Sequence, residues 1–209
     1  MDTLTQAFSS IHWETLVSLM LGISLSAAAG FRVFVPLLIV SGAAILGHID
    51  LPSDFDWAET NQALLILAVA SLIEVIGYYI PFIDALLDTI ATPAAIVAGT
   101  LMTAAAASDL NPALQWTLAI VAGGGTAGLT KGMANVVRAI SIAVTAGLTN
   151  PIVATIELVL AVGLTLLAIT VPLFTGLLVI VGLILTARRI RKFFKQEQPP
   201  ASSPDTVMQ

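Results

Sequence analysis

Apolar residues fill most of this chain in long stretches, separated by short groups of polar, glycine and proline residues. Several of these stretches approach the roughly 20 residues that a helix needs to cross a bilayer. We therefore predict an all-α membrane protein built from about eight hydrophobic helical segments. The expected segments are residues 15–29, 36–47, 62–80, 80–107, 113–130, 133–148, 151–171 and 173–188.

The composition excludes a soluble globular domain. Hydrophobic residues make up 57% of the 209 residues and charged residues 10%, whereas soluble domains carry about 45–50% apolar and about 25% charged residues. The lipid bilayer is therefore the first expected partner. We expect one integral membrane domain over residues 1–195, followed by a polar, Pro/Ser-rich tail over residues 196–209 that should be disordered and cytoplasmic.

The membrane domain reads as two related halves, over about residues 14–107 and 113–192. Setting Glu74 on Glu157 also aligns Thr92 with Thr175 without a gap, and Gly30 aligns with Gly128 after one insertion, the acidic loop near residue 50. The alternative is a chance match between sequences rich in Ala, Leu, Gly and Thr. With four segments each, the halves should enter the membrane from the same side. Internal repeats are common in transporters, where the site lies at the repeat interface.

The first two segments of each half are short. One interpretation is a re-entrant hairpin in each half, broken at Gly30/Arg32 and at Gly128/Lys131, and the other is eight plain spans. A basic run over residues 188–195 predicts a cytoplasmic C-terminus. Counting back through the segments gives a cytoplasmic N-terminus as well.

Ionisable residues inside the apolar segments are the strongest functional signal. Each costs about 2.5–3.5 kcal/mol at the bilayer centre, so most must pair or face water. Arg32 and Lys131 against Glu74 and Glu157 form a balanced set. The expected solute- or ion-binding residues are Arg32, Glu74, Asp84, Asp88, Lys131 and Glu157.

Asp84 and Asp88 lie four residues apart, and Thr92 follows after another four, so the three share one helix face. This face suits proton or cation handling, or it lies at the aqueous end of the helix. Arg138 is either an anchor at the cytoplasmic surface or a partner of Asp88.

A helix that begins after Gly30 or Gly128 would present free N–H groups beside Arg32 or Lys131, which favours an anion. The ligand would be a small anionic solute or a lipid headgroup. We expect no metal and no cofactor, because the chain has no cysteine, and its two histidines lie far apart. The glycine-rich stretch AGGGTAG lacks the features of a phosphate loop. No nucleophile with a base can be assembled, so we expect neither an enzyme nor a nucleic-acid partner.

The stretches SAAAGFRVFVPLL, IEVIGYYIPFIDALLDTIATP and GLTKGMANVVRA resemble a family of small bacterial membrane proteins with plastid relatives, known only as a domain of unknown function. The resemblance covers about residues 18–192. Its most specific pieces are the glycine-arginine turn and the pattern formed by Tyr79, Pro81, Asp84 and Asp88. It implies an integral membrane protein of a bacterial inner or plasma membrane and supplies no activity.

Three functions follow from the residues. The first is a small transporter or channel, for an anionic solute or coupled to protons, with a water-accessible cavity at the charges. The second is a lipid scramblase or carrier, which needs a groove open sideways to lipid. The third is a scaffold or assembly factor, in which no cavity reaches the charges. Small-residue faces at Gly22 and Ser26, and at Gly123 and Ala127, would suit a homo-oligomer.

Overall fold

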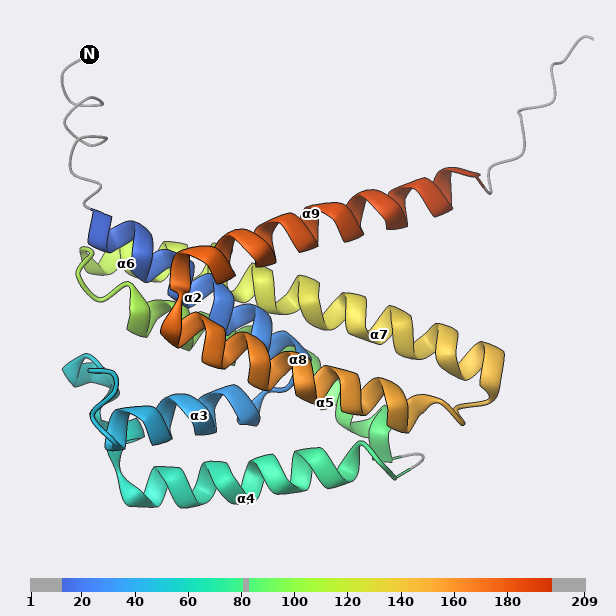
Figure 1. Ribbon diagram of the computed structural model, residues 1–209, viewed down its shortest axis with the longest axis horizontal. Helices are drawn as coiled ribbons and strands as arrows, with labels where there is room; N and C mark the ends of the chain where they lie inside the picture. Colours follow the sequence, from blue (N-terminus) through green and yellow to red (C-terminus); the bar gives the residue numbers. More distant parts are fainter. Residues whose placement is uncertain (1–12, 81–82, 197–209) are drawn as a thin grey trace, which may run out of the picture.

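Helices account for almost all of the architecture (Figure 1). The computed structural model describes residues 13–80 and 83–196, with side chains as far as Arg189. The predicted tail beyond residue 196 and Pro81 of the sequence pattern lie outside these residues. In chain order the elements are α2 (Trp13–Phe31), α3 (Phe34–Ile45), the 3₁₀-helix η1 (Ser53–Glu59), α4 (Asn61–Gly77), α5 (Ile83–Ala106), α6 (Pro112–Leu118), the π-helix η2 (Ala119–Gly124), α7 (Gly125–Thr145), α8 (Asn150–Thr170) and α9 (Pro172–Gln196).

The predicted all-α membrane class is confirmed. Four helices are long and apolar enough to cross a bilayer, namely α2, α5, α8 and the part of α9 up to Arg189. A fifth crossing results if η1 and α4 count as one bent span. Large apolar side chains are exposed along these helices, as a lipid-facing surface requires.

Helix α2 lies at the centre of the bundle and packs against α5, α7, α8 and α9. Its second half is rich in small residues, and all positions from Ser24 to Gly30 are buried. Small side chains let helix backbones approach closely, which is how helices associate inside membranes. The Ser26 hydroxyl donates to the Gly99 carbonyl of α5 at 2.7 Å and lies 2.9 Å from the Thr103 hydroxyl. This packing places the end of α2, and hence Arg32, deep in the molecule.

The predicted break near Arg32 is confirmed, but Gly30 does not form it. Gly30 is the penultimate residue of α2, and the helix stops between Phe31 and Phe34. The cause is Pro36, which has no N–H to donate to the Arg32 carbonyl and whose ring would clash with it in a continuous helix. Gly30 serves packing instead, because a Cβ there would lie 2.5 Å from the Thr130 Cβ. Helices α2 and α3 then form a hairpin whose turn lies inside the bundle (Figure 1).

The second predicted break, at Gly128 and Lys131, is wrong. Helix α6, the π-helix η2 and α7 follow one another without a gap, and both residues lie within α7. The physical reason is the absence of a proline. Ala134 occupies the position that aligns with Pro36, and alanine is the best helix former. The π-turns of η2 are single-turn features that helices absorb without stopping.

This continuous helix changes the expected topology. Two of the eight predicted segments, 113–130 and 133–148, form one continuous helix. Helices α4 and α8 run in opposite directions along the bundle (Figure 1). Helix α2 and the continuous α6–α7 helix run in the same direction, because Gly22 and Gly123 both lie against Thr103, and Gly30 lies against Thr130. That both halves enter the membrane from one side therefore stays a prediction, although the first half contains a hairpin where the second contains one crossing helix. The alignment of the halves remains a prediction.

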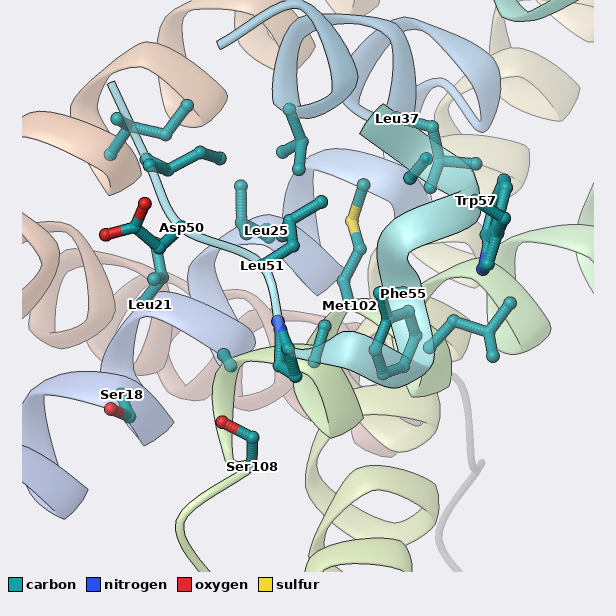
Figure 2. A pocket seen from close by; sticks show the side chains of 18 of the residues that line it. Ser18, Leu21, Leu25, Leu37, Asp50, Leu51, Phe55, Trp57, Met102 and Ser108 are labelled. Carbon is teal, nitrogen blue, oxygen red and sulfur yellow. The ribbon is translucent and has the colours of Figure 1, made fainter. Parts of the chain in front are cut away.

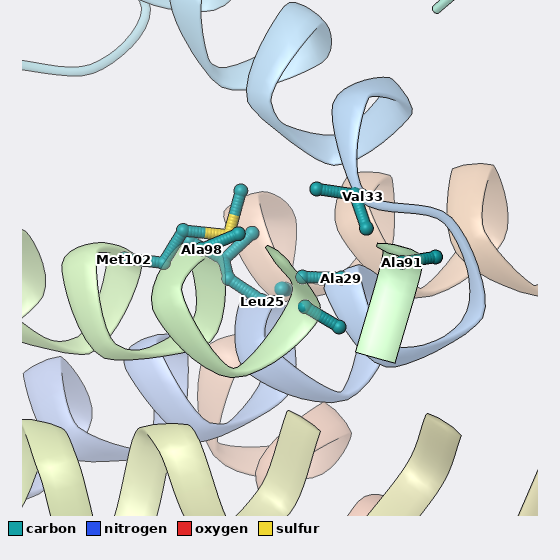
Figure 3. Close-up of a cluster of buried hydrophobic side chains, with 8 residues drawn as sticks. Leu25, Ala29, Val33, Ala91, Ala98 and Met102 are labelled. Atoms are coloured by element: carbon teal, nitrogen blue, oxygen red, sulfur yellow. The ribbon is translucent and has the colours of Figure 1, made fainter. Parts of the chain in front are cut away.

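An apolar core separates the two ends of the bundle. Leu25 and Ala29 of α2, Val33 of the hairpin turn and Met102 of α5 meet in it (Figure 3), together with Ala91, Ala95, Ala98 and Ala168. Val33 is also the residue that follows Arg32, so the core begins directly beside the charged residues.

Candidate functional site

Arg32 is fully buried at the hairpin turn between α2 and α3. Its Nη2 donates to the Ala154 carbonyl of α8 at 2.9 Å and lies 3.5 Å from the Glu157 Oε2. Its Nε and Nη1 have no hydrogen-bond partner among the described residues. A guanidinium with free donors in the interior is costly unless an anion or water completes it. The predicted ion pair between Arg32 and a carboxylate of the second half is therefore present, and that carboxylate is Glu157.

Tyr78, at the end of α4, is the centre around which the cations gather. Its ring centroid lies 3.8 Å from the Arg32 Cζ, 4.7 Å from the Arg138 Cζ and 5.1 Å from the Lys131 Nζ. Such cation–π contacts attract by about 2 kcal/mol when they are desolvated. The ring therefore separates three positive charges that would otherwise repel one another directly.

Two carboxylates link these cations into one network. The Asp88 Oδ1 lies 2.7 Å from the Lys131 Nζ, and the Asp88 Oδ2 lies 3.0 Å from the Arg138 Nε. Glu157 pairs with Arg138 as well as with Arg32. The Tyr78 hydroxyl donates to Asp88 at 2.9 Å and accepts from Lys131 at 2.9 Å. We call Arg32, Tyr78, Asp88, Lys131, Arg138 and Glu157 the charge cluster.

The helices fix the geometry of the charge cluster. Lys131 and Arg138 lie seven residues apart on α7, about two turns, so they project from the same face. That face meets the Asp88 face of α5, as the ion pairs show. Of the two interpretations offered for Arg138, the structure supports the pairing with Asp88, because the arginine is buried rather than at a surface.

Glu74 does not form the predicted ion pair within 4 Å; it caps a helix. Its Oε1 accepts from the Val33 N–H at 2.7 Å, and its Oε2 accepts from the Phe34 N–H at 3.0 Å. These are unpaired donors at the start of α3, where the helix dipole favours a negative charge. The anion expected at this helix start is therefore a carboxylate of the protein itself. With Glu74, three carboxylates match the three cations of the charge cluster, and the buried Asp84 lies outside this balance.

Asp84 lies one turn before Asp88 on α5 and outside the ion-pair network. Its Oδ2 accepts from the Asn150 Nδ2 at 2.8 Å, and its Oδ1 accepts from the backbone N–H of Ala85 at 2.7 Å. The residue is buried, and none of the described Lys, Arg or His side chains lies within ion-pair distance of it.

Two cavities reach these residues from one end of the bundle. A cavity of about 380 Å³ touches Tyr78, Asp84 and Asn150 and is bounded by the turn between α7 and α8. A second, of about 320 Å³, runs between α5 and α7 and touches Asp84, Asp88 and Arg138. Neither cavity touches Arg32 or Lys131, which lie behind Tyr78 and Asp88. Asp88, with a side chain 14% exposed, is thus the outermost charged member of the charge cluster.

The structure brings together most of the predicted site and adds residues that the sequence did not single out. Tyr78 and Asn150 were missed, and Arg138 had two interpretations. The signal for Tyr78 was its position four residues after Glu74, on the same helix face. Within residues 13–80 and 83–189, no three His, Asp or Glu side chains gather closely enough to hold a metal ion.

Comparison with known proteins gives one match. The model of a family described as Domain of unknown function (DUF4126) matches residues 19–192 of the chain. No curated protein and no solved structure matches it.

Proposed function

The chain belongs to the DUF4126 family, and from its buried charges we propose that it is a small membrane transporter that moves an anion together with a proton. The observation that carries the proposal is the charge cluster, in which three cations surround one tyrosine ring inside a membrane bundle. A purely structural role would explain the charge cluster poorly, because well-packed apolar residues of similar volume stabilise a protein interior at least as much as buried ion pairs do. We propose transport rather than catalysis.

The charge balance suggests how proton and anion are coupled. Arg32, Lys131 and Arg138 are balanced by Glu74, Asp88 and Glu157 in the paired arrangement. Protonation of Asp88 or Glu157 removes one negative charge and leaves a cation with free donors. An anion that enters then restores neutrality, because an unbalanced charge in the interior costs several kcal/mol. Proton and anion would therefore bind together and leave together.

The cavities suggest the order of events. Asp88 lines the cavity between α5 and α7 and would receive the proton first. Lys131 and Arg138 would then exchange Asp88 for the anion, and Arg32 would supply its unpartnered Nε and Nη1 deeper in the bundle. The apolar core beyond Val33 would close the path to the other end in this state.

Lipid headgroups are the second candidate substrate, and one feature favours them. The cavity between α5 and α7 is flanked by side chains exposed at the bundle surface, Ala85 and Thr89 of α5 and Ala139 and Ile142 of α7. A groove that opens sideways to the hydrocarbon is what a lipid carrier requires. The phosphate of a lipid and a free anion would use the same cations.

We further propose a bacterial plasma membrane, as the sequence resemblance implies, with the C-terminal end of α9 in the cytoplasm. Arg188 and Arg189 begin the basic run at that end. The cytoplasmic N-terminus predicted from the sequence depended on eight full crossings of the membrane. It no longer follows, because α2 begins at the end of the bundle opposite to the end of α9 (Figure 1).

Reconstitution into liposomes tests the transport proposal. A pH-sensitive dye inside the vesicles reports proton entry when chloride, phosphate or succinate is added outside, and fluorescent phospholipid with an external quencher reports lipid movement. We expect one of the anions to drive proton entry with the wild-type protein. Arg32→Ala should reduce it to the level of protein-free vesicles, whereas Arg188→Ala, which changes an exposed arginine, should leave it unchanged.

Arg32→Lys is a second variant for the case that Arg32→Ala does not fold. It keeps the positive charge but loses the planar set of N–H donors of the guanidinium. Folding of each variant is checked by its elution as a single species in detergent. Proton entry at background for every anion with the folded wild-type protein would contradict the proposal. Lipid movement lost in Arg32→Ala, without anion-driven proton entry, would replace the free anion by the lipid headgroup.

A further inference from the structure

A third cavity lies at the other end of the bundle from the charge cluster. It has a volume of about 440 Å³, within the range of about 300–1,000 Å³ typical of small-molecule sites. Leu25, Leu51, Phe55 and Met102 group at its centre, with Asp50, Ser18 and Ser108 toward its edge (Figure 2). The site therefore has an apolar interior and a polar rim.

The segment over the cavity is held at a few defined points. Phe55 of η1 is buried against Ala104 and Ala119, and the Ser41 hydroxyl of α3 donates to the Ala58 carbonyl at 2.5 Å. Trp57 also lines the cavity and is about half exposed. The cavity is thus bounded by α2, α3 and α5 on one side and by η1 on the other.

Charge at this end of the molecule has a single sign. Asp50 and Asp109 line the cavity, and η1 adds three exposed carboxylates, Asp54, Asp56 and Glu59. The eight Lys and Arg residues of the chain are all elsewhere, at positions 32, 131, 138 and between 188 and 195. A uniformly negative rim attracts cations and repels anions. The indole of Trp57 adds an aromatic surface that binds organic cations.

We propose that this cavity binds an amphipathic organic cation, with the apolar body among Leu25, Phe55 and Met102 and the positive charge at Asp50 and Asp109. The apolar lining selects for a hydrophobic body, and the rim selects the sign of the charge. An anionic amphiphile of the same size should bind poorly. The inference does not depend on the proposed transport function, since it rests on residues at the opposite end of the bundle.

Two probes of equal size and opposite charge test the proposal, namely tetraphenylphosphonium and tetraphenylborate. Binding of radiolabelled tetraphenylphosphonium is measured on the full chain in nanodiscs of uncharged lipid, with empty nanodiscs as background. We expect saturable binding of about one cation per chain. The double variant Asp50→Asn/Asp109→Asn should weaken it about tenfold, as the loss of two partly exposed charge contacts implies.

The matched control is Asp54→Asn/Asp56→Asn, which removes two exposed carboxylates from η1 that do not line the cavity. Its affinity should stay within about twofold of wild type. Ala105→Phe, which places a ring in the cavity, should abolish binding in a protein that still elutes as a single species. Arg32→Ala should bind the cation normally, which separates this site from the charge cluster.

Three results would overturn the inference: no saturable binding of tetraphenylphosphonium, equal saturable binding of tetraphenylborate, or unchanged affinity in the Asp50→Asn/Asp109→Asn variant. Equal binding of both ions would assign the cavity to the acyl chains of lipid, without selection by charge.

Discussion

Tyr78 joins the charge cluster through both its ring and its hydroxyl, and a single substitution separates the two. Tyr78→Phe keeps the ring near Arg32 but removes the hydroxyl that donates to Asp88 and accepts from Lys131. Hydrogen bonds to charged groups contribute about 1.5–3 kcal/mol. We therefore expect the variant to lose about 2 kcal/mol of unfolding free energy, measured by titration of the micelle-bound protein with a denaturing detergent.

Tyr79→Phe provides the neighbouring control. The Tyr79 hydroxyl bonds Thr155 at an exposed position, so its loss should change the unfolding free energy by about 0.5 kcal/mol or less. Equal effects of the two substitutions would mean that the Tyr78 hydroxyl does not hold the charge cluster together.

At the scale of single residues, the sequence revealed which charges had to be buried but not which of them would pair. Arg32 and Glu157 were expected together, because an isolated charge in an apolar segment needs a partner. The pairing of Lys131 with Asp88, and the use of Glu74 as a helix cap, depend on the rotation of each helix about its axis. That rotation is set by packing between segments distant in sequence, which periodicity alone does not report.

At the scale of helices, Gly30 gives a direct test of the packing of α2 on α7. A Cβ at position 30 would lie 2.5 Å from the Thr130 Cβ and 2.7 Å from the Ala127 carbonyl oxygen. Gly30→Ala should therefore force the two helices apart and lower the unfolding free energy by about 1–3 kcal/mol. The same denaturing-detergent titration measures it.

Gly132→Ala is the matched substitution on α7. Nothing lies within 4 Å of a Cβ there, so alanine should leave stability unchanged or raise it by up to about 1 kcal/mol through its helix propensity. A Gly30→Ala variant as stable as Gly132→Ala would contradict the close contact of α2 with α7.

The helices themselves were largely predictable, and their breaks only in part. The apolar segments located α4, α5 and α8 to within a few residues, and the start of α9 equally well, because length and hydrophobicity suffice for a membrane helix. The break at Arg32 follows from Pro36, a local steric effect. The expected break at Gly128 relied on the short apolar segments on either side of it and on glycine, and glycine lowers helix propensity by only about 1 kcal/mol, which close packing outweighs.

At the scale of the whole molecule, charge is distributed from end to end. The acidic η1 region lies at the end of the bundle where α2 begins, and α9 carries its arginines toward the other end (Figure 1). Because the basic end should be cytoplasmic, Ser53 should face the outside and Leu148, in the α7–α8 turn, the cytoplasm. The chain has no native cysteine, so single cysteines report this cleanly.

A membrane-impermeant maleimide added to intact cells should label Ser53→Cys and not Leu148→Cys. After permeabilisation both should react, since Leu148 is 85% exposed and Ser53 is also exposed. Labelling of both variants in intact cells, or of Leu148→Cys alone, would show that the bundle is oriented differently.

The π-helix η2 sets the direction in which the side chains of α7, the helix that follows it, point around the helix axis. Within η2, Gly123 and Gly124 lie against Gly99 and Thr100 of α5, and downstream α7 presents its two basic side chains to Asp88. A π-turn holds one residue more than an α-turn, and one residue corresponds to about 100° of rotation. Removal of a single residue from η2 would therefore swing the ammonium and guanidinium groups by roughly a quarter of a circle away from Asp88.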